Sequence, residues 1–304
     1  MRIIFMGTPD FAVPSLEILA DNGYEIAGVV TVADKPGGRM GILESPVKKC
    51  AVARGIPLLQ PLKLKDPAFL EALAALKADL QVVVAFRMLP EVVWRMPGMG
   101  TLNLHGSLLP KYRGAAPINH AIMNGETETG VTTFFLQHEI DTGDIIQQRR
   151  MEIGPDETAG ELHDRMMLMG AQVVLETVNA IRDGVVVPQP QPSAAATHAP
   201  KIFHETCEIN CTQPAAAVHN FVRGLSPWPG AWMRLKDGKQ FKIFRTRVLE
   251  GTSDAPAGTF VQRQKGTLQL STGSGLVDIL EAQLEGKKKL PVKELLNGYD
   301  FFGG

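Results

Sequence analysis

Residues 101–117 read Thr-Leu-Asn-Leu-His-Gly-Ser-Leu-Leu-Pro-Lys-Tyr-Arg-Gly-Ala-Ala-Pro. The stretch begins as an apolar strand and runs into a turn rich in Pro and Gly. Residues two apart in a strand share a face, so Asn103 and His105 are predicted side by side at the strand's C-terminal end. Open α/β sheets place their ligand crevice there. An amide beside an imidazole suits oxyanion stabilisation with a proton managed nearby, and spacing alone supports this interpretation and a purely structural one equally.

Around this strand, the first 187 residues alternate strand-like and helix-like segments. Strands are predicted at 3–6, 25–31, 80–85, 102–105, 131–136 and 144–148, and helices at 11–20, 46–53, 66–76, 117–123 and 158–182. This βαβ order predicts a largely parallel sheet covered on both faces. The first strand leads into Gly7-Thr8-Pro9-Asp10, where only Gly7 fits the three-glycine dinucleotide fingerprint. A nicotinamide cofactor is therefore not expected, and the turn is interpreted as a tight capped turn or a ligand contact.

The segment Val187-Pro188-Gln189-Pro190-Gln191-Pro192-Ser193 has Pro at alternate positions, which favours extended, semi-rigid backbone. It is interpreted as an interdomain linker. Beyond it, a helix at 214–222 precedes short strands at 231–235, 241–248, 258–262, 267–270 and 276–283. These short strands predict a small β-barrel.

Composition narrows the class of protein. The 304 residues carry a net charge of −1 and are 44% hydrophobic, which is ordinary for a globular protein of about two domains. Residues 201–304 hold 14 Lys/Arg against 10 Asp/Glu, whereas residues 1–200 hold 17 against 22; a basic C-terminal part is compatible with a polyanion partner. Three cysteines exclude a disulfide framework. Because there is neither a signal-peptide pattern nor an apolar run of about 20 residues, a cytoplasmic protein is expected.

Asp141 lies in Glu139-Ile140-Asp141-Thr142-Gly143-Asp144. A glycine turn with an aspartate cap is the favoured interpretation from spacing alone. The functional alternative places the carboxylate beside His105, where it would tune the protonation of the imidazole.

Two basic segments and one Cys/His set also have alternative interpretations. The glycine-rich loop 34–44 is either a solvated loop or a basic arm that orders against phosphates, and Lys287-Lys288-Lys289 with Lys293 is either a solvated turn or a nucleic-acid contact. The basic residues around that loop are Lys35, Arg39, Lys48 and Lys49. The set His204, Cys207, Cys211 and His219 does not have the usual spacing of a zinc site.

Several motifs together resemble those of the methionyl-tRNA formyltransferase family along nearly the whole chain. Residues 3–14 resemble the family's first strand and helix, and Asn103-Leu104-His105 with Ser107-Leu108-Leu109-Pro110 resembles the signature of enzymes that use 10-formyltetrahydrofolate. Arg113-Gly114-Ala115-Ala116-Pro117 narrows the likeness to the methionyl-tRNA type and its sugar-modifying relatives. Asp141-Thr142-Gly143-Asp144 resembles the catalytic aspartate loop. Pro227-Trp228-Pro229-Gly230-Ala231 and Gly286-Lys287-Lys288 resemble the C-terminal domain, an OB-type barrel in this family.

Two positions depart from the family pattern. Gly38-Arg39 is followed by Met40-Gly41-Ile42-Leu43, where the family usually carries more lysine. Arg87, in Ala85-Phe86-Arg87, stands where many relatives have glycine, near the expected folate pocket.

The resemblance implies an α/β fold: a Rossmann-like formyltransferase domain with a mostly parallel sheet at 1–187, a linker at 188–204, and an OB-type tRNA-binding barrel at 205–304. It implies transfer of a formyl group from 10-formyltetrahydrofolate to the α-amino group of methionine on initiator methionyl-tRNA, for translation initiation. The folate is a co-substrate and no metal is expected. The protein is expected to be a monomer with no membrane association.

The resemblance also assigns residues to roles. The catalytic ones are Asn103, His105 and Asp141. The folate-lining ones are Ser107, Leu108, Leu109, Pro110, Phe86 and Arg87. The tRNA contacts are Lys35, Arg39, Lys287, Lys288 and Lys289.

Other functions stay open at this point. Formyl transfer to glycinamide ribonucleotide would need only the first domain, and the basic C-terminal run separates the tRNA enzymes from those acting on amino sugar nucleotides. Water in place of the amine would give a formyltetrahydrofolate hydrolase. A non-catalytic RNA-binding protein is disfavoured by the joint presence of Asn103, His105 and Asp141.

Overall fold

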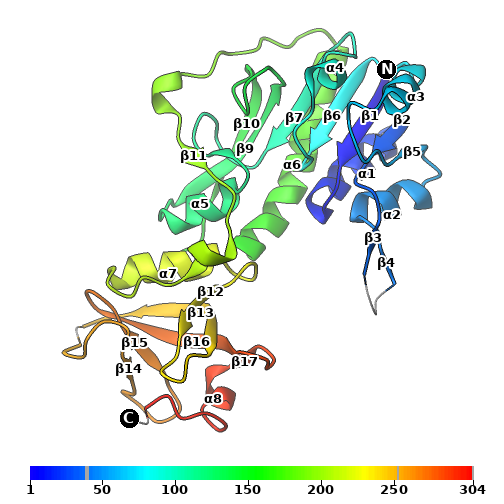
Figure 1. Ribbon diagram of the computed structural model, residues 1–304. Coiled ribbons are helices and arrows are strands. Elements are labelled where there is room, and N and C mark those ends of the chain that lie inside the picture. Colours follow the sequence, from blue (N-terminus) through cyan, green and yellow to red (C-terminus); the bar gives the residue numbers. More distant parts are fainter. Residues whose placement is uncertain (38–40, 252, 303–304) are drawn as a thin grey trace. The chain divides into compact units, whose positions relative to one another are not determined.

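A computed structural model describes residues 1–37, 41–251 and 253–302. The N-terminal part is built on a seven-stranded sheet with the order β10-β9-β7-β6-β1-β2-β5 (Figure 1). Neighbouring strands from β7 to β5 are parallel, and β9 pairs antiparallel with β7. The strands are β1 (Arg2–Gly7), β2 (Glu25–Val30), β5 (Leu58–Leu59), β6 (Leu80–Val84), β7 (Thr101–His105), β9 (Glu128–Phe135) and β10 (Ile145–Glu152).

Burial on both faces explains why the central strands read as continuous apolar runs. The side chains of 3–6 in β1 are at most 1% exposed. Ile4 and Met6 join a core cluster with Val83 of β6 and with residues of α3 (Pro67–Ala75) and α4 (Glu91–Trp94). Gly170 of α6 (Ala159–Arg182) lies so close to β7 that an added Cβ would stand 2.8 Å from Leu104 Cδ2. The Leu104 side of β7 therefore packs on α6, and Asn103 and His105 belong to the other side.

The helices begin where the sequence supplies caps or proline. The Ser45 hydroxyl accepts from the backbone N–H of Lys48 at the start of α2, and the Asp66 carboxylate accepts from Ala68 at the start of α3. The bounds are η1 (Asp10–Ala12), α1 (Val13–Asp21), α2 (Pro46–Ala53), α3 (Pro67–Ala75), α4 (Glu91–Trp94), α5 (Pro117–Met123), α6 (Ala159–Arg182), η3 (Ser193–Ala195), η4 (His204–Cys207), α7 (Ala215–Gly224) and α8 (Val292–Leu295).

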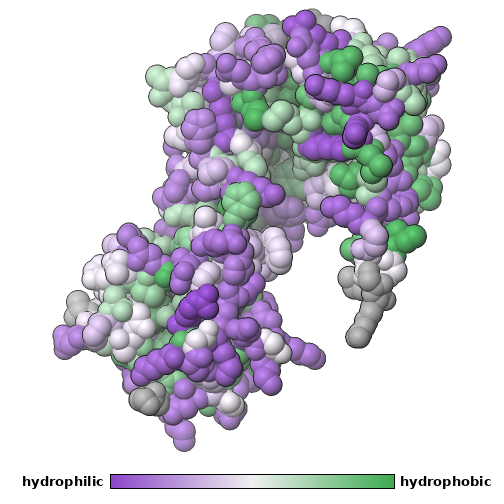
Figure 2. Space-filling model, viewed as in Figure 1, coloured by the Kyte–Doolittle hydropathy of each residue, from purple (hydrophilic) through white to green (hydrophobic). Residues whose placement is uncertain are grey.

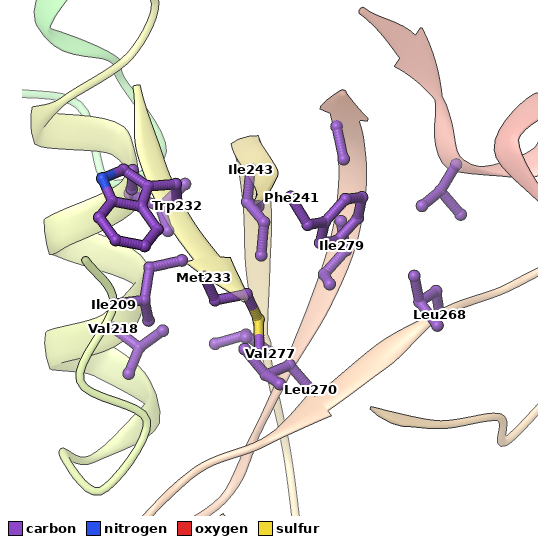
Figure 3. Packing of buried hydrophobic residues seen from close by; sticks show 14 of the residues in the cluster. Ile209, Val218, Trp232, Met233, Phe241, Ile243, Leu268, Leu270, Val277 and Ile279 are labelled. Carbon is purple, nitrogen blue, oxygen red and sulfur yellow. The ribbon is translucent and has the colours of Figure 1, made fainter. Parts of the chain in front are cut away.

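The C-terminal part holds an antiparallel sheet with the order β12-β13-β16-β15-β14, and β17 also pairs with β16. Its core includes Trp232, Phe241, Ile243 and Ile279, with Val218 from α7 (Figure 3). The predicted closure into an OB-type barrel stays a prediction. The strands are β12 (Ala231–Arg234), β13 (Gln240–Leu249), β14 (Phe260–Val261), β15 (Gln269–Ser271), β16 (Leu276–Leu284) and β17 (Leu290–Pro291).

Two short pairs complete the fold: β3 (Lys35–Pro36) with β4 (Ile42–Leu43), and β8 (Arg113–Gly114) with β11 (His198–Ala199). Packing divides the chain into two compact units, one of residues 1–114, 130–151 and 163–198, and one of 115–129, 152–162 and 199–304. Residues 188–198, at the start of the predicted linker, thus pack with the N-terminal unit. The limits 1–187, 188–204 and 205–304 stay predictions.

The predicted α/β class with a mostly parallel sheet is confirmed. The first α-helix starts at Val13 rather than at residue 11, because Asp10–Ala12 form a 3-10 turn. Pro14 follows at the second position of the α-helix. The strand predicted at 258–262 covers only Phe260–Val261. Within the described ranges, no helix is long and apolar enough to cross a membrane.

Candidate active site

The site begins at the C-terminal end of β7. Asn103 lies opposite Val83 of β6 and Phe134 of β9, and His105 lies opposite Thr132 of β9. His105 is buried and Asn103 is half-buried. The ends of β1, β6 and β7 meet at this edge of the parallel sheet. The strand order reverses between β1 and β6, and open α/β sheets bind ligands at such a point.

Asp141, in the loop between β9 and β10, lies close to His105, the last residue of β7. Oδ2 of Asp141 stands 3.7 Å from Nδ1 of His105, and the side chains are 13% and 7% exposed. This separation exceeds a hydrogen bond but holds the two groups in close electrostatic contact. The same Oδ2 accepts a hydrogen bond of 2.8 Å from the backbone N–H of Gly114. The structure thus places the Asp141 carboxylate beside His105, within a turn, and the catalytic role of Asp141 stays a prediction.

The tautomer of His105 follows from its second partner. Nε2 lies 2.8 Å from the carbonyl oxygen of Tyr112. A carbonyl only accepts, so Nε2 carries the hydrogen and donates it. Nδ1 is then the ring atom that faces Asp141 and is left without a hydrogen in the neutral imidazole.

The turn after β7 is held by hydrogen bonds from β9 and β10. The Thr132 hydroxyl, fully buried, donates to the carbonyl of Ser107 and accepts from the N–H of Leu109. Gln148 of β10 donates to the carbonyl of Leu109 and to the same hydroxyl, and the Ser107 hydroxyl donates to the carbonyl of Lys111. These hydrogen bonds hold the backbone of the turn in place. Of the predicted folate contacts, Ser107, Leu109 and Pro110 are buried and Leu108 is half-buried, and their contact with folate stays a prediction.

Phe86 and Arg87 follow β6 at the same edge of the sheet. The Arg87 guanidinium donates to the carbonyls of Pro61 and Leu62 and lies 5.6 Å from the Phe86 ring centroid. These hydrogen bonds hold the guanidinium against the loop that follows β5. Gly7, at the end of β1, is required for packing, because an added Cβ would stand 2.7 Å from that of Ala12.

The predicted tRNA contacts lie on both units. Lys35 is exposed on β3, and Arg39 lies outside the described residues. Lys48 is tied to Asp34 and Glu44, and the hydrogen bond to Asp34 raises the pKa of Lys48. This lysine closes the base of the β3–β4 hairpin rather than offering a free charge. Lys287 and Lys288 are exposed in the β16–β17 turn, where the visible surface is mostly hydrophilic (Figure 2).

The Cys/His set has structural partners. His204 stacks on Trp232, and the Cys207 thiol contacts the carbonyl of Phe203. His219 is buried between the Thr246 hydroxyl and the carbonyl of Pro155. Among the residues with described positions, no group of three or more His, Cys, Asp or Glu is placed to hold a metal ion.

Thr132, Gln148 and Gln191 are site residues that sequence reasoning missed. Each acts through hydrogen bonds to backbone carried by a distant segment, and an isolated Thr or Gln gives no signal of such a partner. Gln191 even lies in the segment interpreted as a linker, although its side chain contacts the Asp141 loop.

Comparison with known proteins gives two domain matches. The Formyl transferase family matches residues 1–178, and the Formyl transferase, C-terminal domain family matches residues 201–300. Similar solved structures include a sugar 3N-formyltransferase, WlaRD, with a TM-score of 0.70 at 20% identity over 95% of this chain and 99% of that one. HypX from Aquifex aeolicus in complex with tetrahydrofolic acid gives 0.68 at 21% identity, over 100% of this chain and 48% of HypX. The fold and the domain matches define the class as formyl transferases.

Curated relatives define the family more narrowly. A methionyl-tRNA formyltransferase of Bacteroides thetaiotaomicron is 51% identical over 100% of this chain and 97% of its own length. One from Flavobacterium johnsoniae is 48% identical over 99% of this chain and 97% of its length. The chain therefore belongs to the methionyl-tRNA formyltransferase family.

Proposed function

We propose that this protein transfers a formyl group from 10-formyltetrahydrofolate to the α-amino group of methionine on initiator methionyl-tRNA. The observation that carries the proposal is the arrangement at the end of β7, where Asn103, His105 and Asp141 lie at the ligand edge of a formyl transferase fold. The near-full-length likeness to methionyl-tRNA formyltransferases supports this acceptor.

The chemistry needs a donor for an oxyanion and an acceptor for a proton. The amine nitrogen bonds to the formyl carbon, and a tetrahedral intermediate with a negative oxygen forms. Nδ1 of His105 takes a proton from the attacking amine. Asn103 and the protonated Nδ1 then donate hydrogen bonds to that oxygen, and Asp141 stabilises the imidazolium. Nδ1 gives the proton to N10 of the folate as the carbon–N10 bond breaks, so the His105–Asp141 pair ends as it began.

The fixed parts of the site supply geometry rather than charge. The Ser107–Pro110 turn is held by Thr132 and Gln148 and would line the folate. Phe86 and Arg87 would border the same pocket, with Arg87 ordering the loop at Pro61 and Leu62. Because the donors and the carboxylate suffice for amine attack, the mechanism uses no metal.

The tRNA would be held by phosphate contacts from Lys35, Arg39 and Lys287–Lys289, so its binding should weaken with salt. Lys289 is partly committed, since it contacts Glu281 at 2.9 Å and lies over the Phe244 ring. We assign the two exposed lysines before it the larger share. The enzyme is proposed to act as a cytoplasmic monomer.

The experiment offers labelled 10-formyltetrahydrofolate with charged initiator tRNA, charged elongator methionine tRNA, glycinamide ribonucleotide and an amino sugar nucleotide in parallel. Selective label on initiator tRNA supports the proposal. Label on a small amine, with none on either tRNA, would assign the site to another formyl acceptor. Release of free formate without any acceptor would indicate a hydrolase.

A further inference from the structure

Gln191 occupies the centre of four hydrogen bonds beside the active site. Its carbonyl oxygen accepts from Nε and Nη2 of Arg113 at 3.1 and 2.7 Å. Its amide nitrogen donates to the carbonyl oxygens of Asp141 and Gly143 at 2.9 and 2.8 Å. All four residues belong to the N-terminal unit. One carboxamide therefore joins the loop after β7 to the loop that carries Asp141.

The two loops that Gln191 connects also determine the positions of His105 and Asp141. Arg113 stands between Tyr112, whose carbonyl accepts from His105, and Gly114, whose N–H donates to Asp141. Asp141 has a φ of +54°, a left-handed conformation that is uncommon outside glycine but that aspartate adopts more readily than most residues. The Gln191 side-chain amide donates a hydrogen bond to the backbone carbonyl of Asp141 itself.

The backbone around Gln191 is anchored independently of its side chain. Gln189 exchanges two backbone hydrogen bonds of 2.8 Å with Ile145. On the other side, the Thr197 carbonyl accepts from the N–H of Arg113 and the Thr197 hydroxyl accepts from the N–H of Tyr112. A substitution at Gln191 therefore leaves the segment in place and removes only the carboxamide bridge.

We propose that Gln191 is a positioning residue for formyl transfer, which sets the distance between the Asp141 carboxylate and Nδ1 of His105. The inference rests on the proposed function, and it makes the proline-rich segment part of the active site. Because a misplacement of about 1 Å at a catalytic group costs on the order of 10²-fold in rate, the bridge should act on turnover and leave substrate affinity unchanged.

The test compares Gln191→Ala and Gln191→Glu with Gln189→Ala, a matched change in the same segment at an exposed residue whose bonds are made by backbone. A glutamate still accepts from Arg113 but cannot donate to the two carbonyls. We expect both Gln191 variants to lower kcat by about 10–10²-fold, with KM for folate and tRNA changed less than about 2-fold. Gln191→Met, of similar volume, replaces the alanine variant if that one loses cooperative unfolding.

A double-mutant comparison with Asp141→Asn separates positioning from general support. If Gln191 acts through Asp141, adding Gln191→Ala to Asp141→Asn slows transfer no further. Multiplying effects, or Gln191 variants as active as Gln189→Ala, would overturn the inference while the wild-type transfer to tRNA still stands. A wild-type protein that forms no formylmethionyl-tRNA would instead contradict the proposed function, whatever the variants do.

Discussion

Substituting Gly143 with alanine should disable the enzyme through a backbone clash two residues from Asp141. A Cβ on Gly143 would stand 1.7 Å from the carbonyl oxygen of Phe135 and 2.9 Å from Cδ2 of Phe134. The loop must retreat by more than about 1 Å, since the packed strand cannot yield as a flexible side chain would. The Gly143 carbonyl also accepts from Gln191, so the retreat moves the whole Asp141 loop.

The expected size follows from these contacts. Misplacing the carboxylate by about 1 Å should lower kcat for formyl transfer by roughly 10²-fold. Overpacking should cost about 1–3 kcal/mol of stability, which lowers Tm by roughly 2–12 °C. Steady-state transfer to charged initiator tRNA and calorimetric unfolding measure the two effects.

Gly98→Ala is the matched control, because nothing lies within 4 Å of the added Cβ and the residue belongs to the same unit. We expect it to resemble the wild type in both assays. If Gly143→Ala turned over within about 2-fold of Gly98→Ala, Asp141 would not depend on this loop position. A loss of stability with an unchanged kcat would refute the catalytic part of the reasoning alone.

Three further predictions concern other parts of the chain. Thr132→Val removes the hydroxyl that bonds to the Leu109 N–H and the Ser107 carbonyl. It should therefore lower the free energy of unfolding by about 1–3 kcal/mol and raise the KM for folate. Thermal unfolding and folate kinetics like those of the wild type would contradict this. Burial, followed by the charge of Arg223, lowers the pKa of His219 below 6.5. Below pH 6.5 the unfolded chain then binds more protons than the folded one, so this contribution to stability is complete above pH 6.5 and is lost as pH falls through the lowered value. Urea unfolding at pH 7.5 and 5.0 should show a smaller pH dependence for His219→Gln than for the wild type, and equal dependences would refute the assignment. Substituting Lys287 and Lys288 together with alanine should raise the KM for tRNA and reduce the slope of log affinity against log salt by roughly 1–2. The control Lys63→Ala/Lys65→Ala changes an exposed pair in the N-terminal unit and should alter neither quantity. Equal slopes for the two double variants would contradict the tRNA contact of Lys287 and Lys288.

Local signals made much of this structure predictable. The alternation of Leu102 and Leu104 with Asn103 and His105 placed two polar side chains at a strand end, because strand geometry has a fixed period of two. Ser45 and Asp66 marked helix starts through short-range hydrogen bonds. Such features depend on a few neighbouring residues and can be read without knowing the fold.

The unpredicted parts depend on distant partners. Asp141 reaches His105 because β9 pairs antiparallel with β7, whereas the βαβ order indicated only a mostly parallel sheet. Gln191 lies in a segment whose prolines indicate extended backbone but carry no information about the side chain's partners. The sequence shows Lys48 only as one of the basic residues around the loop 34–44, and its ion pairs with Asp34 and Glu44 could not be read from it.

The most direct test of the account is single-turnover formyl transfer by the wild type, Asn103→Ala and Asp141→Asn, with saturating folate and charged initiator tRNA. Loss of one preorganised oxyanion donor should cost about 3–4 kcal/mol, or 10²–10³-fold in rate. We predict a loss of that order for Asn103→Ala and a comparable one for Asp141→Asn, with both substrates still bound. Transfer by either variant at nearly the wild-type rate would show that the chemistry does not take place at the end of β7.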